Sequence, residues 1–492
     1  MSRRESSRPN DARQRARARE EAEDLVRLLN DGPSAYHAVA ALKRRLTAAG
    51  FAELHEDEPF AIEPGGRYMV ERHGSALAAF IPGARPPSAG GFRMIGAHTD
   101  SPALKLKPRP EIVTQGIVHL GIEIYGGPLL ATWLDRDLGL CGRAILHADE
   151  RTPARPRGRA KSAPPAVRPD ANLEMRLFAS GRPVVGMPNL AIHMNRAVND
   201  EGLKVNPQTQ LAPILGTAAR LPEQDALRVV LGKLLNVPPA RIVDFDAYLY
   251  DTQPACFAGW EEEFILGGHQ DDLAMCHAAV RALIGFAGAE GGNPARGRAQ
   301  RPAGRPARRT GGGDAAAATR VVVCYDSEEV GSQTTAGARS TLLPHVLERI
   351  ALALGDDREG YFAALALSQL VSADNAHAVH PGFADRSEPH HAPRLNGGPV
   401  IKAHASRAYA TDAYAAAFFE LACRRAGVPF QRFVNRADAK SGSTIGSMTA
   451  AQLGVPTVDV GSPQFAMHSI REMGGALDPW YMTRAMEAFL RG

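Results

Sequence analysis

Five short polar motifs, widely separated in the chain, carry side chains that bind metal ions and move protons. Each motif follows an apolar run or opens a helix. The motifs are residues 96–102 (Gly-Ala-His-Thr-Asp-Ser-Pro), 270–273 (Gln-Asp-Asp-Leu), 326–332 (Asp-Ser-Glu-Glu-Val-Gly-Ser), 372–374 (Ser-Ala-Asp) and 464–469 (Gln-Phe-Ala-Met-His-Ser). Two metal ions about 3.5–4 Å apart can both activate a water and polarise a carbonyl. These histidines and carboxylates are the ligand types of such a two-metal hydrolytic site.

The first motif places a histidine and a carboxylate two residues apart, just after a predicted strand. A loop there lets His98 bind a metal while Asp100 accepts a hydrogen bond from the other ring nitrogen, which fixes the imidazole tautomer. A single histidine at a strand end is more often an ordinary polar group. Metal binding by His98 is therefore supported only when the other motifs are considered together with it.

Two adjacent carboxylates follow the buried apolar run 321–325. Burying unpaired charge is costly, so Glu328 and Glu329 are unusual at this position. Neighbouring side chains of an extended segment point in different directions, so one can bind a metal while the other faces the activated water. A solvated acidic turn is the alternative for this pair alone.

The remaining candidates are ambiguous one by one. Asp271 lies at a helix start, where an isolated Asp is usually a cap or a first-turn carboxylate. Asp374 ends an apolar run, and the nearby His377 and His380 offer two further possible ligands. His468 follows a strand and a turn. Motifs of other hydrolases and of nucleotide-binding proteins are absent: there is no GxSxG elbow, P-loop or GxGxxG fingerprint.

Strands alternating with helices in the outer parts of the chain predict an α/β sandwich with a largely parallel sheet. Ligands of such sheets bind beyond the carboxyl ends of the strands, where four of the five motifs fall. A β-rich pattern interrupts this order, and three segments are rich in Arg, Pro, Ala or Gly. The predicted division is a disordered basic tail (1–19), a catalytic domain (20–108 and 244–492, with a disordered loop at 288–319) and an inserted β-rich domain (109–243, with a flexible loop at 150–169).

The composition limits the class of protein further. Much of the basic excess behind the net charge of +4 lies in segments predicted to be unstructured, so it does not indicate a nucleic-acid partner. The five scattered Cys form no CxxC pair, which argues against a disulfide framework and against a thiolate zinc site. The Arg-rich N-terminus is no secretory signal, and no run is apolar enough to cross a bilayer. We expect a cytoplasmic protein with no membrane partner.

Taken together and in order, the motifs resemble those of the aspartyl aminopeptidase family, which are dinuclear zinc exopeptidases. The resemblance covers nearly the whole chain apart from the tail and the two low-complexity loops. Further matching segments are residues 104–108, 132–138, 188–193, 375–381, 398–402, 441–446 and 461–472.

The resemblance implies a zinc-exopeptidase-type αβα sandwich with an inserted β-rich oligomerisation domain. It implies two Zn per subunit, with Co or Mn able to substitute. The implied metal ligands are His98 and Asp374 for one zinc, Glu329 and His468 for the other, and Asp271 as the bridge. Glu328 would be the general base, and Asp100 would orient His98.

Two substrate-binding positions also follow from the resemblance. His193, on the inserted domain, would reach the active site of a neighbouring subunit in a dodecamer, and Lys402 would lie near the substrate pocket. Residues 269–273 depart from the family, which usually has Arg-Leu-Asp-Asn-Leu there. Asp272 is therefore an alternative bridge, although the register favours Asp271.

The expected activity is a metal-dependent aminopeptidase that releases N-terminal Asp or Glu from peptides, since the family favours acidic residues. One alternative is a dinuclear metallohydrolase of different scope, a neutral aminopeptidase or a deacylase. A second alternative is a non-catalytic scaffold, but a structural metal site would not need a general-base candidate such as Glu328. Nucleic-acid binding through the Arg-rich segments is a third, but flexible solvated loops explain those segments better.

Overall fold

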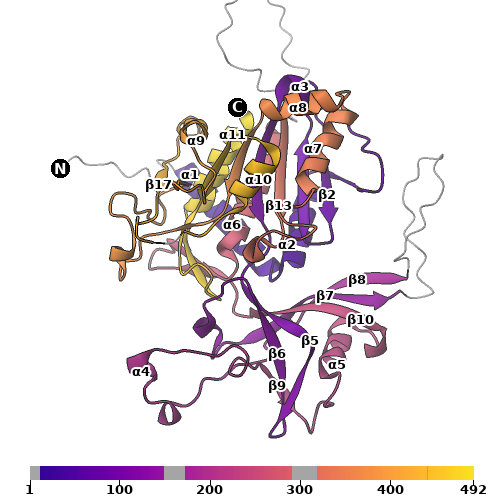
Figure 1. Cartoon of the computed structure of the whole chain (residues 1–492), viewed down its shortest axis with the longest axis vertical. Coiled ribbons are helices and arrows are strands. Elements are labelled where there is room, and N and C mark those ends of the chain that lie inside the picture. The colour runs from indigo at the N-terminus through magenta and orange to yellow at the C-terminus, as the bar shows by residue number, and fades with distance from the viewer. Residues whose placement is uncertain (1–11, 149–171, 291–317, 440) are drawn as a thin grey trace, which may run out of the picture. The chain divides into compact units, whose positions relative to one another are not determined.

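The computed structural model describes residues 12–148, 172–290, 318–439 and 441–492. The chain divides into two compact units: unit 1 is Met1–Ser101 with Ala255–Gly492, and unit 2 is Pro102–Pro254 (Figure 1). Unit 2 thus begins before and ends after the predicted insert of 109–243, because complete strands lie at both of its ends. The predicted loop 150–169, and residues 291–317 of the predicted loop 288–319, lie outside the described residues.

Unit 1 is built on a nine-stranded sheet. In spatial order its strands are β1 (Ala52–Leu54), β2 (Tyr68–Arg72), β3 (Ala76–Ile81), β13 (Thr319–Tyr325), β4 (Phe92–His98), β14 (Gln369–Ala373), β18 (Thr457–Gly461), β16 (Val400–Lys402) and β17 (Gln431–Phe433). The four strands β13, β4, β14 and β18 run parallel, with antiparallel neighbours on both sides. Their residues are almost all buried, as expected for strands covered on both faces.

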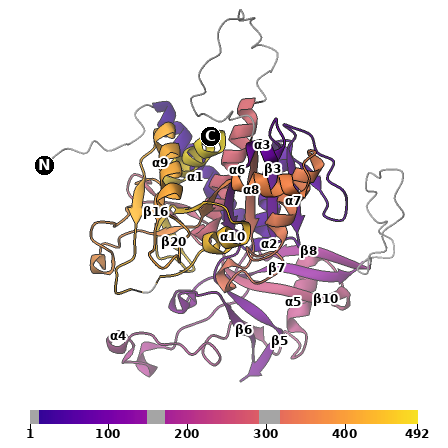
Figure 2. The same cartoon turned by 45° about the horizontal axis from the view of Figure 1, so that its top comes forward.

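Helices cover both faces of this sheet, and each face has its own hydrophobic core. Figures 1 and 2 show these two layers of helices around the strands of unit 1. One layer holds α1 (Ala12–Asp31), α2 (Ala35–Ala48), α6 (Gln270–Glu290), α9 (Ala413–Ala426) and α11 (Asp478–Arg491), and the other holds α7 (Leu342–Ala353), α8 (Arg358–Ala366) and α10 (Ile445–Leu453). The short α3 (Pro87–Gly90) precedes β4. The predicted α/β class is confirmed.

Helix α1 corrects the predicted extent of the disordered tail. The helix begins at Ala12, within the predicted tail of residues 1–19, and its residue Ala18 is buried. Ala and Arg both have high helix propensity, so the Arg-rich composition that suggested disorder is compatible with a helix. Arg19 forms ion pairs with Glu23 and Glu262, which ties this first part of α1 to the folded body.

A five-stranded sheet, also in unit 1, flanks the segments that carry two of the motifs. Its order is β11 (Cys256–Ala258), β12 (Phe264–Gly267), β20 (Glu472–Gly475), β19 (Pro463–Phe465) and β15 (Ala376–His377). Asp374 lies between β14 and β15, and His468 lies in the loop between β19 and β20. This small sheet therefore fixes the loops beyond the large sheet.

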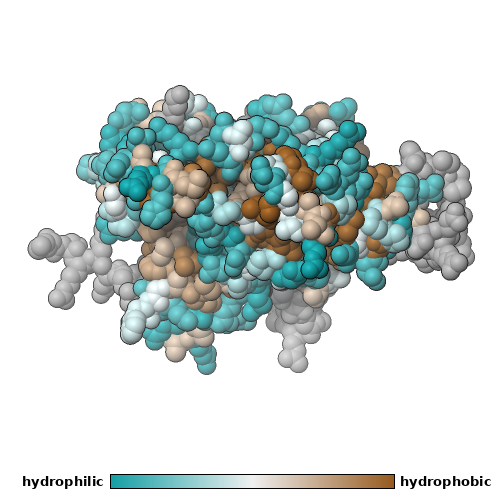
Figure 3. Space-filling model, turned by 90° about the horizontal axis from the view of Figure 1, so that it is seen from below, coloured by the Kyte–Doolittle hydropathy of each residue, from teal (hydrophilic) through white to brown (hydrophobic). Residues whose placement is uncertain are grey.

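Unit 2 contains a six-stranded antiparallel sheet. Its order is β8 (Leu173–Ala179), β7 (Leu138–His147), β10 (Ile242–Asp251), β5 (Ala103–Thr114), β6 (Ile117–Tyr125) and β9 (Ile214–Thr217), and its helical segments are η1 (Leu130–Trp133), η2 (Ile192–Met194), α4 (Val198–Glu201), α5 (Ala226–Leu235) and η3 (Pro239–Arg241). The space-filling view in Figure 3 shows hydrophobic side chains exposed among hydrophilic ones.

Among the described residues of the whole chain, no helix combines the length and apolar character needed to span a bilayer.

Candidate active site

The carboxyl ends of the central parallel strands of unit 1 carry most of the predicted site residues. His98 is the last residue of β4, and Asp374 directly follows β14. The short helix η5 (Glu328–Val330), just after β13, presents Glu328 and Glu329. Parallel strands end at the same edge of a sheet, so this topology gathers motifs that are far apart in sequence.

Asp271 lies in the middle of this group. Its Oδ1 atom is 3.6 Å from Nε2 of His98, and its Oδ2 atom is 3.4 Å from Nε2 of His468. His468 Nε2 is also 3.4 Å from Oε1 of Glu329. The described residues form three groups whose potential ligand atoms all lie within 4.8 Å of one another. The groups are His98 with Asp271 and Asp272, His98 with Glu328 and Glu329, and Asp271 with Glu329 and His468.

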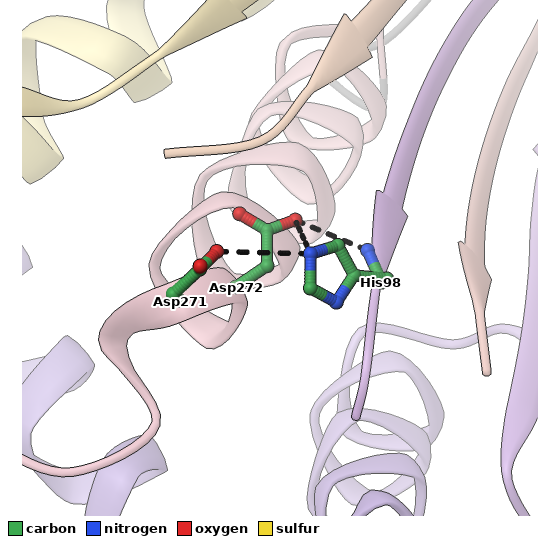
Figure 4. A group of neighbouring side chains, drawn as sticks. All are labelled: His98, Asp271 and Asp272. Carbon is green, nitrogen blue, oxygen red and sulfur yellow. Dashed lines mark hydrogen bonds and ion pairs between the residues drawn. The ribbon is translucent and has the colours of Figure 1, made fainter. Parts of the chain in front are cut away.

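Asp271 and Asp272 occupy different places beside His98. Figure 4 shows both carboxylates turned toward the imidazole ring. Oδ2 of Asp272 accepts the backbone N–H of His98 at 3.1 Å and lies 3.9 Å from Nε2. Among the ligand groups formed by the described residues, Asp271 is grouped with His468, and Asp272 is not. Asp271 therefore lies near both histidines, whereas Asp272 lies near His98 alone within these groups.

Asp100 connects the first motif to the Glu pair. Its Oδ1 and Oδ2 atoms accept the backbone N–H groups of Glu328 and Glu329, each at 3.1 Å. Oδ1 is also 3.4 Å from Nδ1 of His98, and the same ring nitrogen is 3.1 Å from the backbone oxygen of Asp100. Asp100 is therefore placed to orient the His98 ring and the backbone of the Glu pair together.

Lys402 is buried beside Asp374. Its ammonium group donates to the backbone oxygen and Oδ1 of Asp374 at 2.8 and 3.0 Å, and to the backbone oxygen of Asn375 at 3.1 Å. These bonds use all three ammonium protons. Burial lowers the pKa of Lys402, but the charges of Asp374 and other nearby groups outweigh burial and raise it.

The last predicted site residue, His193, belongs to the other unit. It lies in η2 of unit 2 and is exposed. The structure therefore brings seven of the nine predicted residues together: His98, Asp100, Asp271, Glu328, Glu329, Asp374 and His468. Lys402 is hydrogen-bonded to one of them, Asp374. His193 lies in the other unit.

Burial and nearby carboxylates raise the pKa values of both Glu residues of this cluster. Burial and the neighbouring carboxylates raise the pKa of Glu328 to about 8. Burial, Asp271 and other acidic groups raise the pKa of Glu329 to about 10. A divalent cation among these groups would relieve that repulsion.

The cluster also fits a divalent metal by its donor atoms. Oδ1 of Asp271, Oδ1 of Asp272 and Oε1 of Glu329 are buried and accept no hydrogen bond from the described residues. Buried polar atoms normally have a partner. Imidazole nitrogens and carboxylate oxygens are typical zinc ligands. The residues present therefore fit zinc, and Asp271 belongs to two of the three ligand groups.

A cavity of about 310 Å³ opens onto the cluster. Besides the acidic residues and Lys402, its wall includes His377, Tyr409, Phe433, Met448 and Met467. Sequence reasoning missed the aromatic and Met residues, because they come from separate elements and form no local pattern.

Glu472 is another residue near the cluster to which the sequence assigned no role. It is buried, and it accepts the backbone N–H groups of Asp271 and His468. Its position four residues after His468, in a motif that matched the family, was the available signal.

Comparison with known proteins gives a consistent result. The chain matches the aminopeptidase I zinc metalloprotease family (M18) over residues 28–161, 166–293 and 310–490. It is 39% identical over 470 residues to a probable M18 family aminopeptidase 2 of Clostridium acetobutylicum, which covers 95% of this chain and 98% of the relative.

Solved structures of similar proteins include a chain of the Ape4 and Nbr1 complex, with a TM-score of 0.85, 33% identity, and coverage of 98% of this chain and 87% of that one. Another is the mApe1 dodecamer of S. cerevisiae, with a TM-score of 0.76, 26% identity, and coverage of 96% and 98%. All predicted site residues lie within the segments that match the family.

Proposed function

This chain belongs to the M18 family of aminopeptidases, and from that premise we propose that it is a dinuclear zinc aminopeptidase that removes acidic N-terminal residues from peptides. One observation carries the proposal. The Asp271 carboxylate lies between His98 and His468, with Glu328 and Glu329 beside it at the open cavity.

The ligands follow from the clusters and the family resemblance. His98 and Asp374 would hold one zinc, Glu329 and His468 the other, and Asp271 both. Bound zinc would lower the pKa of a water and polarise the scissile carbonyl. Co or Mn would substitute, because they accept the same nitrogen and oxygen donors.

Glu328 is the proposed general base. It lines the cavity beside the other ligand groups, where its carboxylate can take and return a proton. Its carboxylate would accept the proton of the attacking water and then deliver it to the leaving amine. Asp100 would hold Glu328 and His98 in the positions that this proton transfer requires, because it contacts the Glu328 backbone and the His98 ring.

The acidic preference rests on family resemblance and on one buried charge. Lys402 lines the cavity, so its positive charge would favour a substrate carboxylate, although its protons are bonded to Asp374 and Asn375. The lining of Tyr409, Phe433 and other apolar side chains favours the alternative, a neutral aminopeptidase.

We propose that the enzyme works as a homo-oligomer, a dodecamer like the S. cerevisiae relative. Unit 2 exposes large hydrophobic side chains, including Leu190, Ile192 and Met194, which is typical of an interface. His193 lies among them and would reach the active site of a neighbouring subunit. All five Cys are free, which supports the proposed cytoplasmic location.

Hydrolysis of Asp-, Glu- and Leu-aminoacyl chromogenic substrates tests the function. The purified enzyme is assayed as prepared, after chelation, and after addition of zinc, cobalt or manganese. We expect activity that disappears on chelation, returns with metal, and is highest for Asp or Glu. A preference for Leu would overturn the acidic specificity and leave the aminopeptidase intact. No cleavage with two metals bound would contradict the aminopeptidase itself.

A further inference from the structure

Glu472, the first residue of β20, connects two proposed zinc ligands that lie far apart in sequence. It is 2% exposed. Its Oε2 atom accepts the backbone N–H of Asp271 at 3.1 Å, and its Oε1 atom accepts the backbone N–H of His468 at 2.9 Å. One buried carboxylate thus sets the distance between the backbones of the two ligands.

His468 has a backbone conformation that needs such support. Its φ angle is 69°, in the left-handed region that residues other than Gly rarely adopt. The hydrogen bond from its N–H to Glu472 opposes relaxation of this conformation. Because the imidazole direction depends on the backbone, losing this bond would move the ring relative to Asp271.

A chain of buried amide side chains extends this support to the segment that carries Asp374. Gln464 donates to Oε1 of Glu472 at 3.2 Å and accepts from the Asn375 amide at 2.9 Å. Asn375 also donates to the backbone oxygen of Gln270 at 2.7 Å, and Gln270 donates back to the backbone oxygen of Glu472 at 2.9 Å. Asn375 follows Asp374, a further proposed ligand, and Gln270 precedes Asp271, so this network spans three ligand-bearing segments.

We propose that Glu472 is a positioning residue that holds Asp271 and His468 at the separation that zinc binding requires. This inference rests on the proposed zinc site. The role needs a carboxylate, because both oxygens must accept hydrogen bonds from backbone donors. In Glu472→Gln, one of the two atoms becomes an NH₂ group and faces an N–H donor, whichever way the amide turns.

Zinc affinity measures the role directly. Apo protein is titrated with Zn²⁺ against a competing chelator, and the number and strength of bound ions are compared between wild type and Glu472→Gln. We expect one of two sites to weaken by about 10- to 100-fold, the usual effect of removing a residue that orients a ligand. The cobalt-substituted variant should also show an altered visible spectrum, and high zinc should restore part of kcat.

Asp478→Asn is the matched control. Asp478 is also a buried carboxylate whose two oxygens accept backbone N–H groups, those of Asn396 at 2.7 Å and Gly398 at 2.9 Å, but it contacts no proposed ligand among the described residues. Its loss should lower Tm and leave zinc affinity within about twofold of wild type, because no ligand backbone depends on it. An equal loss of zinc affinity in both variants would reduce the role of Glu472 to general stability.

Gln464→Met is the second variant, and it tests the network if Glu472→Gln does not yield folded protein. It removes one bond to Glu472 and leaves both bonds to the ligand backbones. We expect a smaller loss of zinc affinity, up to about tenfold. Unchanged affinity in Gln464→Met, or in folded Glu472→Gln, would overturn the proposal. Failure of the wild-type protein to bind zinc would overturn the proposed function, and this inference with it.

Discussion

At the scale of single residues, the site separates tasks between acidic side chains of the same kind. Asp100 uses both oxygens on the backbone N–H groups of Glu328 and Glu329. That leaves the two Glu side chains to face the cavity, where Glu329 approaches His468. The adjacent Glu residues are therefore supported identically through the backbone, and their different surroundings give them different proposed roles.

This separation predicts opposite behaviour for two neighbouring variants. Glu328→Gln should lower kcat by about 10²- to 10⁴-fold with both zinc ions retained, because it removes only proton transfer. Glu329→Gln should lose bound zinc. Metal analysis of both proteins beside steady-state kinetics distinguishes the cases. Near-normal turnover in Glu328→Gln would contradict the general-base role.

At the scale of elements, the helices covering the sheet are joined by specific polar contacts as well as by apolar packing. Helix α1 contacts α6 through Asp24, whose Oδ2 atom lies 3.0 Å from Nε2 of the buried His277. Burial raises the pKa of Asp24, but the hydrogen bond and charge of His277 and the charge of Arg45 lower it more, so it lies well below its ordinary value of 3.8. The first helix of unit 1 is thereby fixed to the helix that follows Asp271.

Asp24→Asn should destabilise the protein by about 1.5–3 kcal/mol, the usual contribution of a hydrogen bond to a charged group. The pKa is lower in the folded state, so the stabilisation by ionised Asp24 is present above about pH 4 and is lost as the pH falls toward the folded value. Thermal unfolding of both proteins from pH 7 to pH 3 should show the difference shrinking on acidification.

The control for this prediction lies on the same helix. Asp31 pairs with Arg44 at 3.1 Å, but both side chains are about half exposed or more (48% and 63%). Exposed pairs contribute little, so Asp31→Asn should change Tm only slightly. A loss of stability as large as that of Asp24→Asn would contradict the importance of burial.

At the scale of the whole molecule, the chain combines a unit that holds the proposed zinc ligands with a unit that exposes apolar side chains. The described residues of unit 2 expose Leu190 at 57% and Met194 at 74%. The loop that carries them also carries His193. This arrangement suits a subunit that completes the site of its neighbour, as proposed above.

Mixed oligomers test this proposal. His193→Ala and Glu328→Gln proteins should each be nearly inactive while remaining assembled. Oligomers formed from both should regain part of the activity, because a site with intact Glu328 can receive His193 from the other kind of subunit. The control mixture pairs His193→Ala with the His193→Ala/Glu328→Gln double variant and should stay inactive. Full activity of isolated monomers, or no recovery in the first mixture, would contradict action across the interface.

The sequence alone predicted the fold class from local patterns, and it indicated the residues of the candidate cluster through the order of the motifs and their resemblance to a known family. Short apolar runs predict strands, and His98, Glu328 and Asp374 lie where such runs end. The extent of α1 was missed, because its Arg-rich composition masked a helix whose Ala18 packs into the body.

Only the tertiary structure decided which atoms meet. Asp271 and Asp272 are neighbours with the same side chain, and their distances from His98 and His468 distinguish them. Glu472 and the apolar wall of the cavity likewise acquire meaning from contacts between segments hundreds of residues apart. No local pattern encodes such distances, because they result from strand order and loop geometry after the whole sheet has formed.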